Sequence, residues 1–321
     1  MTLTQFPNGV SSMGIPLTGS VNPFGNVWFV AVTGGSDGNS GSDADHAFAT
    51  IAYAISSGVA GDTIVLGPGT HSVDVSTAAL VPKADMQFVA AIPPMGGKPS
   101  TIITHDADDG ATLITVDVDG VGFHGIEFLM VAGGTTAITL IDVSQTTAVS
   151  GLVFKDCWFN LNSVDAAGVQ ALGLDDGTNA TTGLVVKDCR FLGGDATTNQ
   201  SAYMIIGVGG IPKALVEGNT FELESIDGDF AGLQFNDPGA LTSYAVVIRN
   251  NDFIGDDGGG EDNEGITIAA ASEDTEFVGI IRSNYFGGAS ANPITKDQGS
   301  ASQLANYRAD GAGGAIFDPK T

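Results

Sequence analysis

A run of apolar residues, a short polar turn and a phenylalanine recur together along this chain about every 32 residues. The clearest copies of this phrase are Leu152–Phe159 and Leu184–Phe191. The final phenylalanines are Phe128, Phe159, Phe191, Phe221, Phe253 and Phe286, spaced 31, 32, 30, 32 and 33 residues apart. A period of this length indicates stacked supersecondary units. Because the phrase is rich in β-branched and aromatic residues, it predicts a parallel β-solenoid.

The pattern divides the chain into three regions. Residues 1–26 contain Pro, Gly and Asn without helical spacing, which predicts an extended N-terminal arm. Residues 27–290 hold the repeats and form the predicted solenoid. Residues 291–321 lose the period, and we expect them to cap the open end of the last coil, where backbone groups would otherwise be unpaired.

Residues 35–71 follow a recognisable order: a Gly-Ser-Asp loop, an amphipathic helix over about 44–57, then a strand and a Pro-Gly-Thr turn. Ser42 or Asp43 is the expected N-cap of this helix. The order resembles the first segment of pectin-lyase-like proteins, in which a short helix caps the first coil. The resemblance covers about residues 27–290. It implies an all-β fold, a single-stranded right-handed parallel β-helix with a short N-terminal capping α-helix.

Stacked coils place equivalent residues in columns. The repeated phenylalanines should form an internal aromatic stack. Two positions before five of them a second column contains Cys157, Cys189, Asn219, Asn251 and Asn284. We expect the asparagines to form a ladder of inward amides and the cysteines to act as small buried hydrophobes. A redox or metal role for the cysteines would need partner residues that the sequence does not show.

A third column forms a basic stripe. Lys155, Lys187, Glu217, Arg249 and Arg282 lie four positions before a repeated phenylalanine and should point outward by strand alternation. Four of the chain's 11 basic residues therefore share one column. The stripe is either a solvated face in which Glu217 relieves repulsion, or a contact surface for an acidic partner such as a second copy of the chain.

Charge narrows the range of partners. The chain carries 11 basic and 37 acidic residues, a formal net charge of −26. Phosphate backbones and anionic membrane surfaces would be repelled, so neither nucleic acid nor a membrane is an expected partner. The first residues, from Met1 to Asn8, do not have the basic and apolar regions of a secretory signal. Two cysteines do not make a disulfide scaffold, and we expect synthesis in a reducing cytoplasm.

The sequence does not carry the segments that enzymes of the resembled family use. Pectate lyases contain Arg-x-Pro-x-x-Arg, and galacturonan hydrolases contain Asn-Thr-Asp, Gly-His-Gly and Arg-Ile-Lys; none is present. We therefore predict no catalytic residues, no resident metal and no cofactor. Calcium is a weaker alternative, because residues 37–43, 106–110 and 256–262 are acidic and glycine-rich, although none fits the EF-hand template.

These observations favour a non-enzymatic structural protein of a tailed-phage virion. The phrase Phe6–Pro16 resembles the starts of phage structural proteins, which implies a decoration or cement protein on a capsid. In this interpretation the arm docks on a major capsid or other virion protein, and the β-helix projects as a homotrimer assembled in the host cytoplasm. The arm residues expected at the contact are Phe6, Val10, Met13, Ile15 and Phe24.

Two other functions remain open at this point. A tailspike-like protein would bind or cleave a host glycan, and predicts a groove with carboxylates and exposed aromatic residues. A bacterial surface adhesin is the third alternative, although the first residues do not resemble an export signal.

Overall fold

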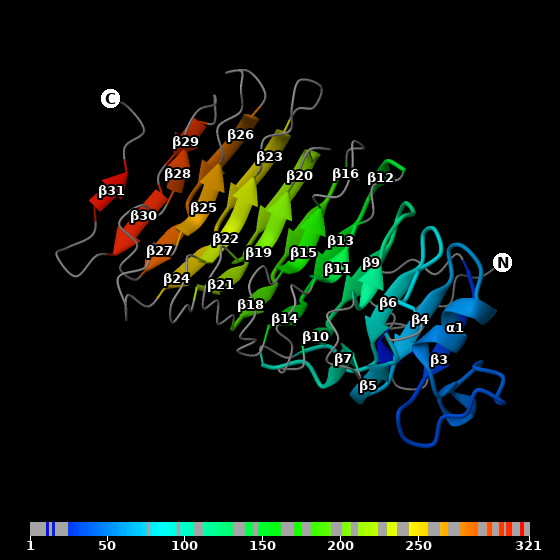
Figure 1. Ribbon diagram of the computed structural model, residues 1–321. Coiled ribbons are helices and arrows are strands. Elements are labelled where there is room, and N and C mark those ends of the chain that lie inside the picture. The colour runs from blue at the N-terminus through cyan, green and yellow to red at the C-terminus, as the bar shows by residue number, and fades with distance from the viewer. Residues whose placement is uncertain are drawn as a thin grey trace, which may run out of the picture.

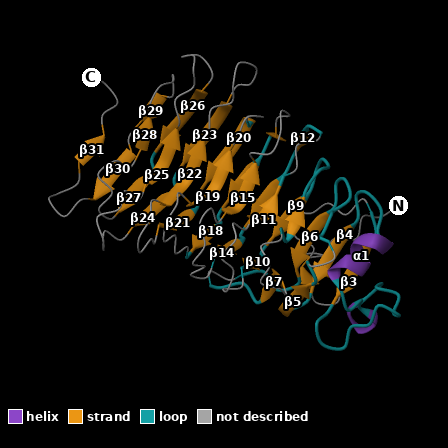
Figure 2. Cartoon of the chain, viewed as in Figure 1, coloured by secondary structure: helices purple, strands orange, loops and turns teal. Residues whose placement is uncertain are grey.

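The computed structural model describes residues 11–12, 15–16, 25–75, 78–94, 97–105, 112–130, 139–143, 147–161, 170–174, 181–193, 201–206, 211–223, 230–235, 244–255, 264–268, 277–287, 294–296, 302–304, 306–309 and 315–317. Over these residues the chain coils into a parallel β-helix that runs from the N-terminal helix toward the C-terminus (Figure 1). Strands dominate, and helix is confined to the N-terminal end (Figure 2). The predicted β-helix with one short cap helix is confirmed.

Most coils give one strand to each of three sheets, which we call sheets I, II and III in their order within one coil, such as β11 (Thr139–Asp142), β13 (Val153–Lys155) and β14 (Trp158–Asn160). Sheet I contains β8 (Ile114–Thr115), β11 (Thr139–Asp142), β15 (Gln170–Leu174), β19 (Ser201–Ile206), β22 (Phe230–Phe235), β25 (Glu264–Ile268) and β28 (Ile294–Lys296). Sheet II contains β3 (Val27–Val30), β4 (Thr63–Leu66), β6 (Gln87–Ala90), β9 (Gly122–His124), β13 (Val153–Lys155), β17 (Val185–Lys187), β20 (Pro212–Glu217), β23 (Tyr244–Arg249), β26 (Phe277–Arg282) and β29 (Ser302–Leu304).

Sheet III contains β5 (Gly69–Val73), β7 (Thr101–His105), β10 (Glu127–Leu129), β14 (Trp158–Asn160), β18 (Arg190–Leu192), β21 (Thr220–Leu223), β24 (Asp252–Gly255), β27 (Tyr285–Gly287), β30 (Asn306–Ala309) and β31 (Ala315–Phe317). Two short pairs lie outside these sheets: β1 (Ser11–Ser12) with β2 (Ile15–Pro16), and β12 (Val149–Ser150) with β16 (Thr181–Thr182).

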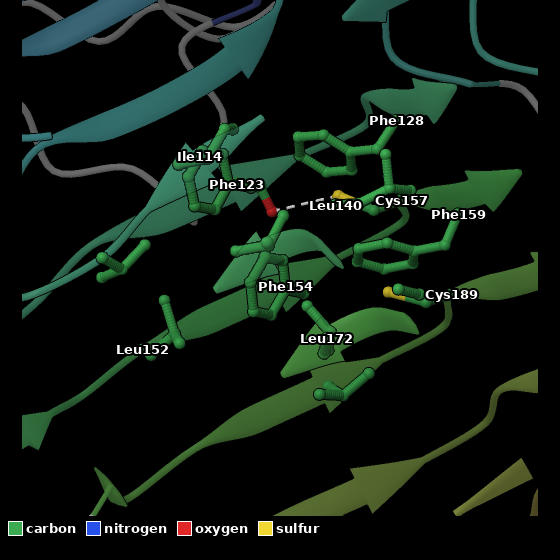
Figure 3. Close-up of a cluster of buried hydrophobic side chains, with 14 of the residues drawn as sticks. Ile114, Phe123, Phe128, Leu140, Leu152, Phe154, Cys157, Phe159, Leu172 and Cys189 are labelled. Atoms are coloured by element: carbon green, nitrogen blue, oxygen red, sulfur yellow. Dashed lines mark hydrogen bonds between the residues drawn. The ribbon is translucent and has the colours of Figure 1, made fainter. Parts of the chain in front are cut away.

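Two stacks of phenylalanine rings fill the core. In the first, Phe128, Phe159, Phe191, Phe221, Phe253 and Phe286 lie in register, with ring centroids of neighbours 4.5 to 5.2 Å apart. The second contains Phe88, Phe123 and Phe154, and meets the first edge-on (Figure 3). Each buried ring contributes roughly 1.5–3 kcal/mol. The sequence analysis identified only the first stack, although Phe123 and Phe154 recur with the same period.

The cap helix is shorter than predicted. Residues 44–46 form a single 3-10 turn, η1 (Ala44–His46), and the α-helix α1 (Ile51–Ser57) begins at the N-cap Thr50. The intervening segment pairs with sheet II instead, because the backbone N–H of Phe48 donates to Phe29 and the carbonyl of Phe48 accepts from Ala31. Asp43 caps only the 3-10 turn, so neither Ser42 nor Asp43 starts the α-helix.

A buried carboxylate holds the first coil to this cap. Asp62 accepts hydrogen bonds from the Trp28 indole at 2.7 Å, from the Val59 amide at 2.8 Å and from the Asn26 amide at 2.7 Å. Burial opposes ionisation of Asp62, but these donors outweigh it and lower its pKa. Lys83 donates to the carbonyls of Ser56 and Gly58 and so closes the C-terminal end of α1.

The solenoid continues beyond the boundary expected at residue 290. Strands β28, β29 and β30 pair in parallel with β25, β26 and β27 and so add a further coil. Strand β31 then turns back and pairs with β30 antiparallel. Within the described parts of the chain, no helix has the length and apolar character needed to cross a membrane.

Candidate functional site

The outer face of sheet II carries two adjacent columns of contrasting chemistry. Within β13, Phe154 points into the core, so Val153 and Lys155 on either side of it point outward. The parallel register repeats this arrangement from coil to coil. We call the two columns together the sheet II face. The cationic column contains His124, Lys155, Lys187, Glu217, Arg249 and Arg282. The apolar column contains Val153, Val185, Leu215, Val247 and Ile280.

Glu217 interrupts the cations and bonds to both neighbours. Its carboxylate lies 2.9 Å from Nε of Arg249 and 3.6 Å from Nζ of Lys187. The ion pair with Arg249 lowers the pKa of Glu217, and Lys187 adds to the effect. The column is thus partly neutralised at its middle. Arg282 is exposed at its C-terminal end.

The apolar column was not identified from the sequence. Its first four members are half-buried, and the Ile280 residue is 40% exposed. A signal was present, because each member stands two positions before a member of the cationic column and points the same way. Partly exposed aliphatic side chains in one unbroken row are typical of a surface that another molecule covers.

His124 continues the cationic column toward the N-terminus but is uncharged at neutral pH. Burial lowers the pKa of its imidazole to about 4, and the charge of Lys155 acts in the same direction. Its Nε2 lies 3.2 Å from the Oε1 atom of Gln87 on the preceding coil. The charged part of the column therefore begins at Lys155.

A tight turn follows each strand of sheet II and forms the corner with sheet III. The residue after each member of the cationic column has a positive φ of 54° to 70°. These corner residues are Gly125, Asp156, Asp188, Gly218, Asn250 and Ser283. Asn and Asp tolerate this conformation better than most residues, and glycine tolerates it best. Burial raises the pKa of Asp188, and the nearby carboxylates of Asp156 and Glu217 raise it further against the lowering effect of Lys187.

The predicted ladder lies just inside this corner. Oδ1 of Asn251 accepts from N and Nδ2 of Asn219, both at 2.9 Å, and Oδ1 of Asn284 accepts from the same two atoms of Asn251, at 3.0 and 2.9 Å. Oδ1 of Asn219 accepts from the backbone N of Cys189 at 2.8 Å. The ladder fixes the spacing of successive corners, because every bond joins one coil to the next.

The two cysteines occupy the same column as buried free thiols. Sγ of Cys157 donates to the carbonyl of Phe123 at 3.3 Å, the position equivalent to the carbonyls that the asparagine amides reach (Figure 3). Burial raises the pKa of Cys189, and its neighbour Cys157 contributes. A buried thiol with a raised pKa is a poor nucleophile, so the geometry favours a structural role.

The outer face of sheet III holds a second group of polar and aromatic residues. The guanidinium of Arg190 lies 5.0 Å from the ring centroid of Trp158 and forms an ion pair with Glu222. Glu127 is fully buried; Lys98 and Asn160 bond to its Oε1 at 3.0 and 3.1 Å.

Toward the C-terminus, the outer face of sheet III carries exposed side chains. Tyr285 is 41% exposed and Ile254 is 45% exposed, and Asp252 lies beside Tyr285 in register. We call these three residues the sheet III patch.

Other predicted site residues stand apart from these surfaces. Phe6, Val10, Met13 and Phe24 lie outside the described residues, and Ile15 is described only as part of β2. The calcium candidates 106–110 and 256–262 also lie outside them. In the loop 37–43, Asp37 instead accepts from the amides of Ala49 and Thr50. Among the described residues, no group of three or more His, Cys, Asp or Glu side chains could hold a metal ion.

Comparisons with known proteins support the fold alone. No family model and no curated protein matches the chain. The pectin methylesterase from Aspergillus niger, in its deglycosylated form, is 13% identical over 90% of this chain and 87% of that chain, with a TM-score of 0.54. Its penultimately deglycosylated form is 14% identical over the same shares, 90% and 87%, with a TM-score of 0.51. A rhamnogalacturonan lyase is 13% identical over 92% of this chain and 90% of that chain, with a TM-score of 0.42. The two pectin methylesterase structures support the expected pectin-lyase-like parallel β-helix fold.

Proposed function

We propose that this chain is a non-enzymatic structural protein that assembles with other copies of itself through the sheet II face. One observation carries the proposal: a row of half-exposed aliphatic residues runs beside a row of cations in a chain of net charge −26. Apolar contact provides affinity, and the cations select an acidic partner. Other copies of the chain are such a partner, because acidic residues outnumber basic ones by 37 to 11.

We further propose that the assembly is a homotrimer and belongs to a phage virion, as a decoration or cement protein. The resemblance of Phe6–Pro16 to the starts of phage structural proteins supports this context. The arm would then dock on a capsid or other virion protein. Deleting residues 2–24 keeps Asn26 and its bonds to Asp62, so the β-helix should fold while association with particles is lost. Unchanged incorporation of this variant into particles would refute the docking role.

Light scattering coupled to size exclusion tests the assembly directly. The wild type should elute well above its monomer mass of 32.5 kDa, and 0.5 M salt, at roughly 4–5 Å Debye length, should weaken the association. Ile280→Asp should shift the protein toward monomer. The matched control is Ile92→Asp, because Ile92 is 52% exposed but lies in the loop after β6 and outside the sheet II face. A wild type that stays monomeric at high concentration would refute the proposal.

A glycan-binding role is the second candidate, and the sheet III patch favours it. An exposed tyrosine beside a carboxylate can stack on a sugar ring and accept hydrogen bonds from its hydroxyls. Titration with neutral and acidic oligosaccharides would test this role, with Tyr285→Ala as the comparison. Binding that Tyr285→Ala abolishes, in a protein that is monomeric throughout, would favour this candidate over assembly.

A further inference from the structure

Three surfaces meet along one edge of the β-helix. The sheet II face lies on one side of the corner residues, and the sheet III patch lies on the other. Only two residues, such as Asp156 and Cys157, separate the last residue of β13 from the first of β14. The edge therefore has the shape of a wedge whose two sides carry different chemistry.

The corner places acids beside cations at the same level. Asp156 directly follows Lys155 and Asp188 directly follows Lys187, so on these two neighbouring coils a cation and an acid lie on either side of the edge. Nζ of Lys155 is 4.0 Å from the carboxylate of its own neighbour Asp156. Burial raises the pKa of Asp188, and the carboxylates of Asp156 and Glu217 raise it further, although Lys187 and Lys155 lower it. The corner therefore holds two neighbouring carboxylates, Asp156 and Asp188, that a cation from another copy can approach.

The far part of the edge is complementary in the same way. Exposed Arg282 and Ile280 belong to the strand of sheet II that leads into Tyr285. On sheet III, Asp252 and Ile254 are exposed one coil earlier. One side of the wedge thus offers a cation and an aliphatic residue, and the other offers a carboxylate, an aliphatic residue and an aromatic ring.

We propose that the sheet II face of one copy packs on the corner and the sheet III patch of the next copy, in a closed ring about an axis parallel to the β-helix. This inference rests on the proposed self-assembly and names its two surfaces. A rotation about such an axis keeps every coil at its own level, so Lys155 meets the level of Asp156, and Arg282 comes within one coil of Asp252.

A symmetric contact of sheet II against sheet II would bring two cationic columns into one interface, where like charges oppose each other. The head-to-tail arrangement avoids this repulsion. Repeated rotation by the same angle also closes this arrangement into a ring. The number of copies in the ring equals a full turn divided by the angle between the two sides of the wedge. The same contact repeated around the ring uses both sides of every wedge.

Cysteine cross-linking distinguishes the two arrangements. The chain's own thiols are both buried, so a short bismaleimide reacts with an introduced surface cysteine. Ile280→Cys and Ile254→Cys place one cysteine on each side of the wedge. A mixture of the two variants should give a cross-linked dimer, whereas each variant alone should give none. Val59→Cys is the control, because Val59 is 57% exposed at the cap, away from both surfaces.

A charge exchange provides a second readout that does not depend on cross-linking. Arg282→Glu and Asp252→Arg should each weaken association about tenfold, the effect of roughly 1.4 kcal/mol at an interface charge pair. Mixing the two single variants should restore association at the junction where the exchanged charges meet. Both residues are exposed, so neither change should affect folding.

The outcomes separate this inference from the function on which it rests. Cross-linking of Ile280→Cys with itself, in a protein that still oligomerises, would overturn the head-to-tail ring and leave self-assembly standing. Cross-linking of Val59→Cys as efficient as that of the mixture would also overturn the ring. A monomeric wild type would overturn both proposals together.

Discussion

The asparagine ladder allows the cost of one side chain to be worked out bond by bond. The side chain of Asn251 makes four hydrogen bonds: it accepts from N and Nδ2 of Asn219 and donates to the carbonyl of Val216 and to Oδ1 of Asn284. In Asn251→Ala, the backbone amide of Asn219 loses its acceptor in the interior, whereas the carbonyl of Val216 loses a second donor and keeps its bond within the sheet. Nδ2 of Asn219 keeps its bond to the carbonyl of Val186, and Oδ1 of Asn284 keeps the bond that it accepts from the backbone N of residue 251.

A buried backbone group without a partner costs about 1–3 kcal/mol and a lost interior hydrogen bond about 1 kcal/mol, so the unpaired amide of Asn219 and the weakened carbonyl of Val216 together predict a loss of about 3 kcal/mol. The chain itself supplies a milder substitution, because cysteine occupies this column at residues 157 and 189. In Asn251→Cys the thiol can donate to the carbonyl of Val216, as Cys157 donates to Phe123. Only the amide of Asn219 then lacks a strong acceptor, which predicts a loss of about 2 kcal/mol.

Urea unfolding gives the total change, and hydrogen exchange at the amide of Asn219 locates it. Exchange there should accelerate most in Asn251→Ala and less in Asn251→Cys. Val59→Ala is the control, because Val59 is 57% exposed at the cap and outside both proposed contact surfaces, so its loss should cost less than about 0.5 kcal/mol. Equal destabilisation by alanine and cysteine, or an unchanged exchange rate at Asn219, would refute the reasoning from unpaired backbone groups.

Three further predictions concern other positions. Lys213 has a φ of 61°, whereas the equivalent residues of two preceding coils are Gly151 and Gly183. Lys213→Gly should therefore stabilise the protein by about 1 kcal/mol in urea unfolding. Destabilisation would show that the lysine side chain contributes a contact. The pKa of His124 is lowered from 6.5 to about 4 in the folded protein. The contribution of the neutral imidazole to the free energy of unfolding should therefore be complete above pH 6.5 and fall by at most roughly 3 kcal/mol as the pH drops toward 4. His124→Gln should flatten this part of the stability profile, and an unchanged profile would contradict the buried neutral imidazole. Asp62→Asn should lower the free energy of unfolding by about 2–3 kcal/mol, because an amide group replaces an oxygen that accepts from Trp28 or Asn26. Trp28 fluorescence in a Trp158→Phe background should report the loosening of the cap. An unchanged emission spectrum in this background would contradict the role of Asp62 in holding the cap.

The period of the final phenylalanines was enough to predict the β-helix, because in-register stacking demands a side chain of similar size at each level. The same logic anticipated the positions of the asparagine ladder and the cationic column. Local periodicity failed at the cap, where residues 44–57 have helical spacing but Phe48 pairs with β3. Asp37 supports that pairing, because its carboxylate accepts from the amides of Ala49 and Thr50, which lie 12 and 13 positions further along the chain. No spacing rule for helices includes such a contact.

The surface was harder to predict than the core. The apolar column became visible only when strand direction and register were known, since Val153 and Val185 by themselves are ordinary strand residues. The wedge depends on the tight turn after each cation, which the sequence shows only as a mixture of Asp, Gly, Asn and Ser. These residues share a tolerance of positive φ rather than a common side chain.

The ladder and the parallel register also determine how the protein carries force. Every bond from Asn284 to Asn251 to Asn219 runs along the long axis, as do the backbone bonds between coils. A pulling force along that axis would act on every inter-coil layer in series, so the weakest layer would separate first. A sideways push would meet the stacked phenylalanine rings, which share the load across many coils. The molecule should therefore be stiff across its width and should yield stepwise along its length, which suits a lateral contact along the edge.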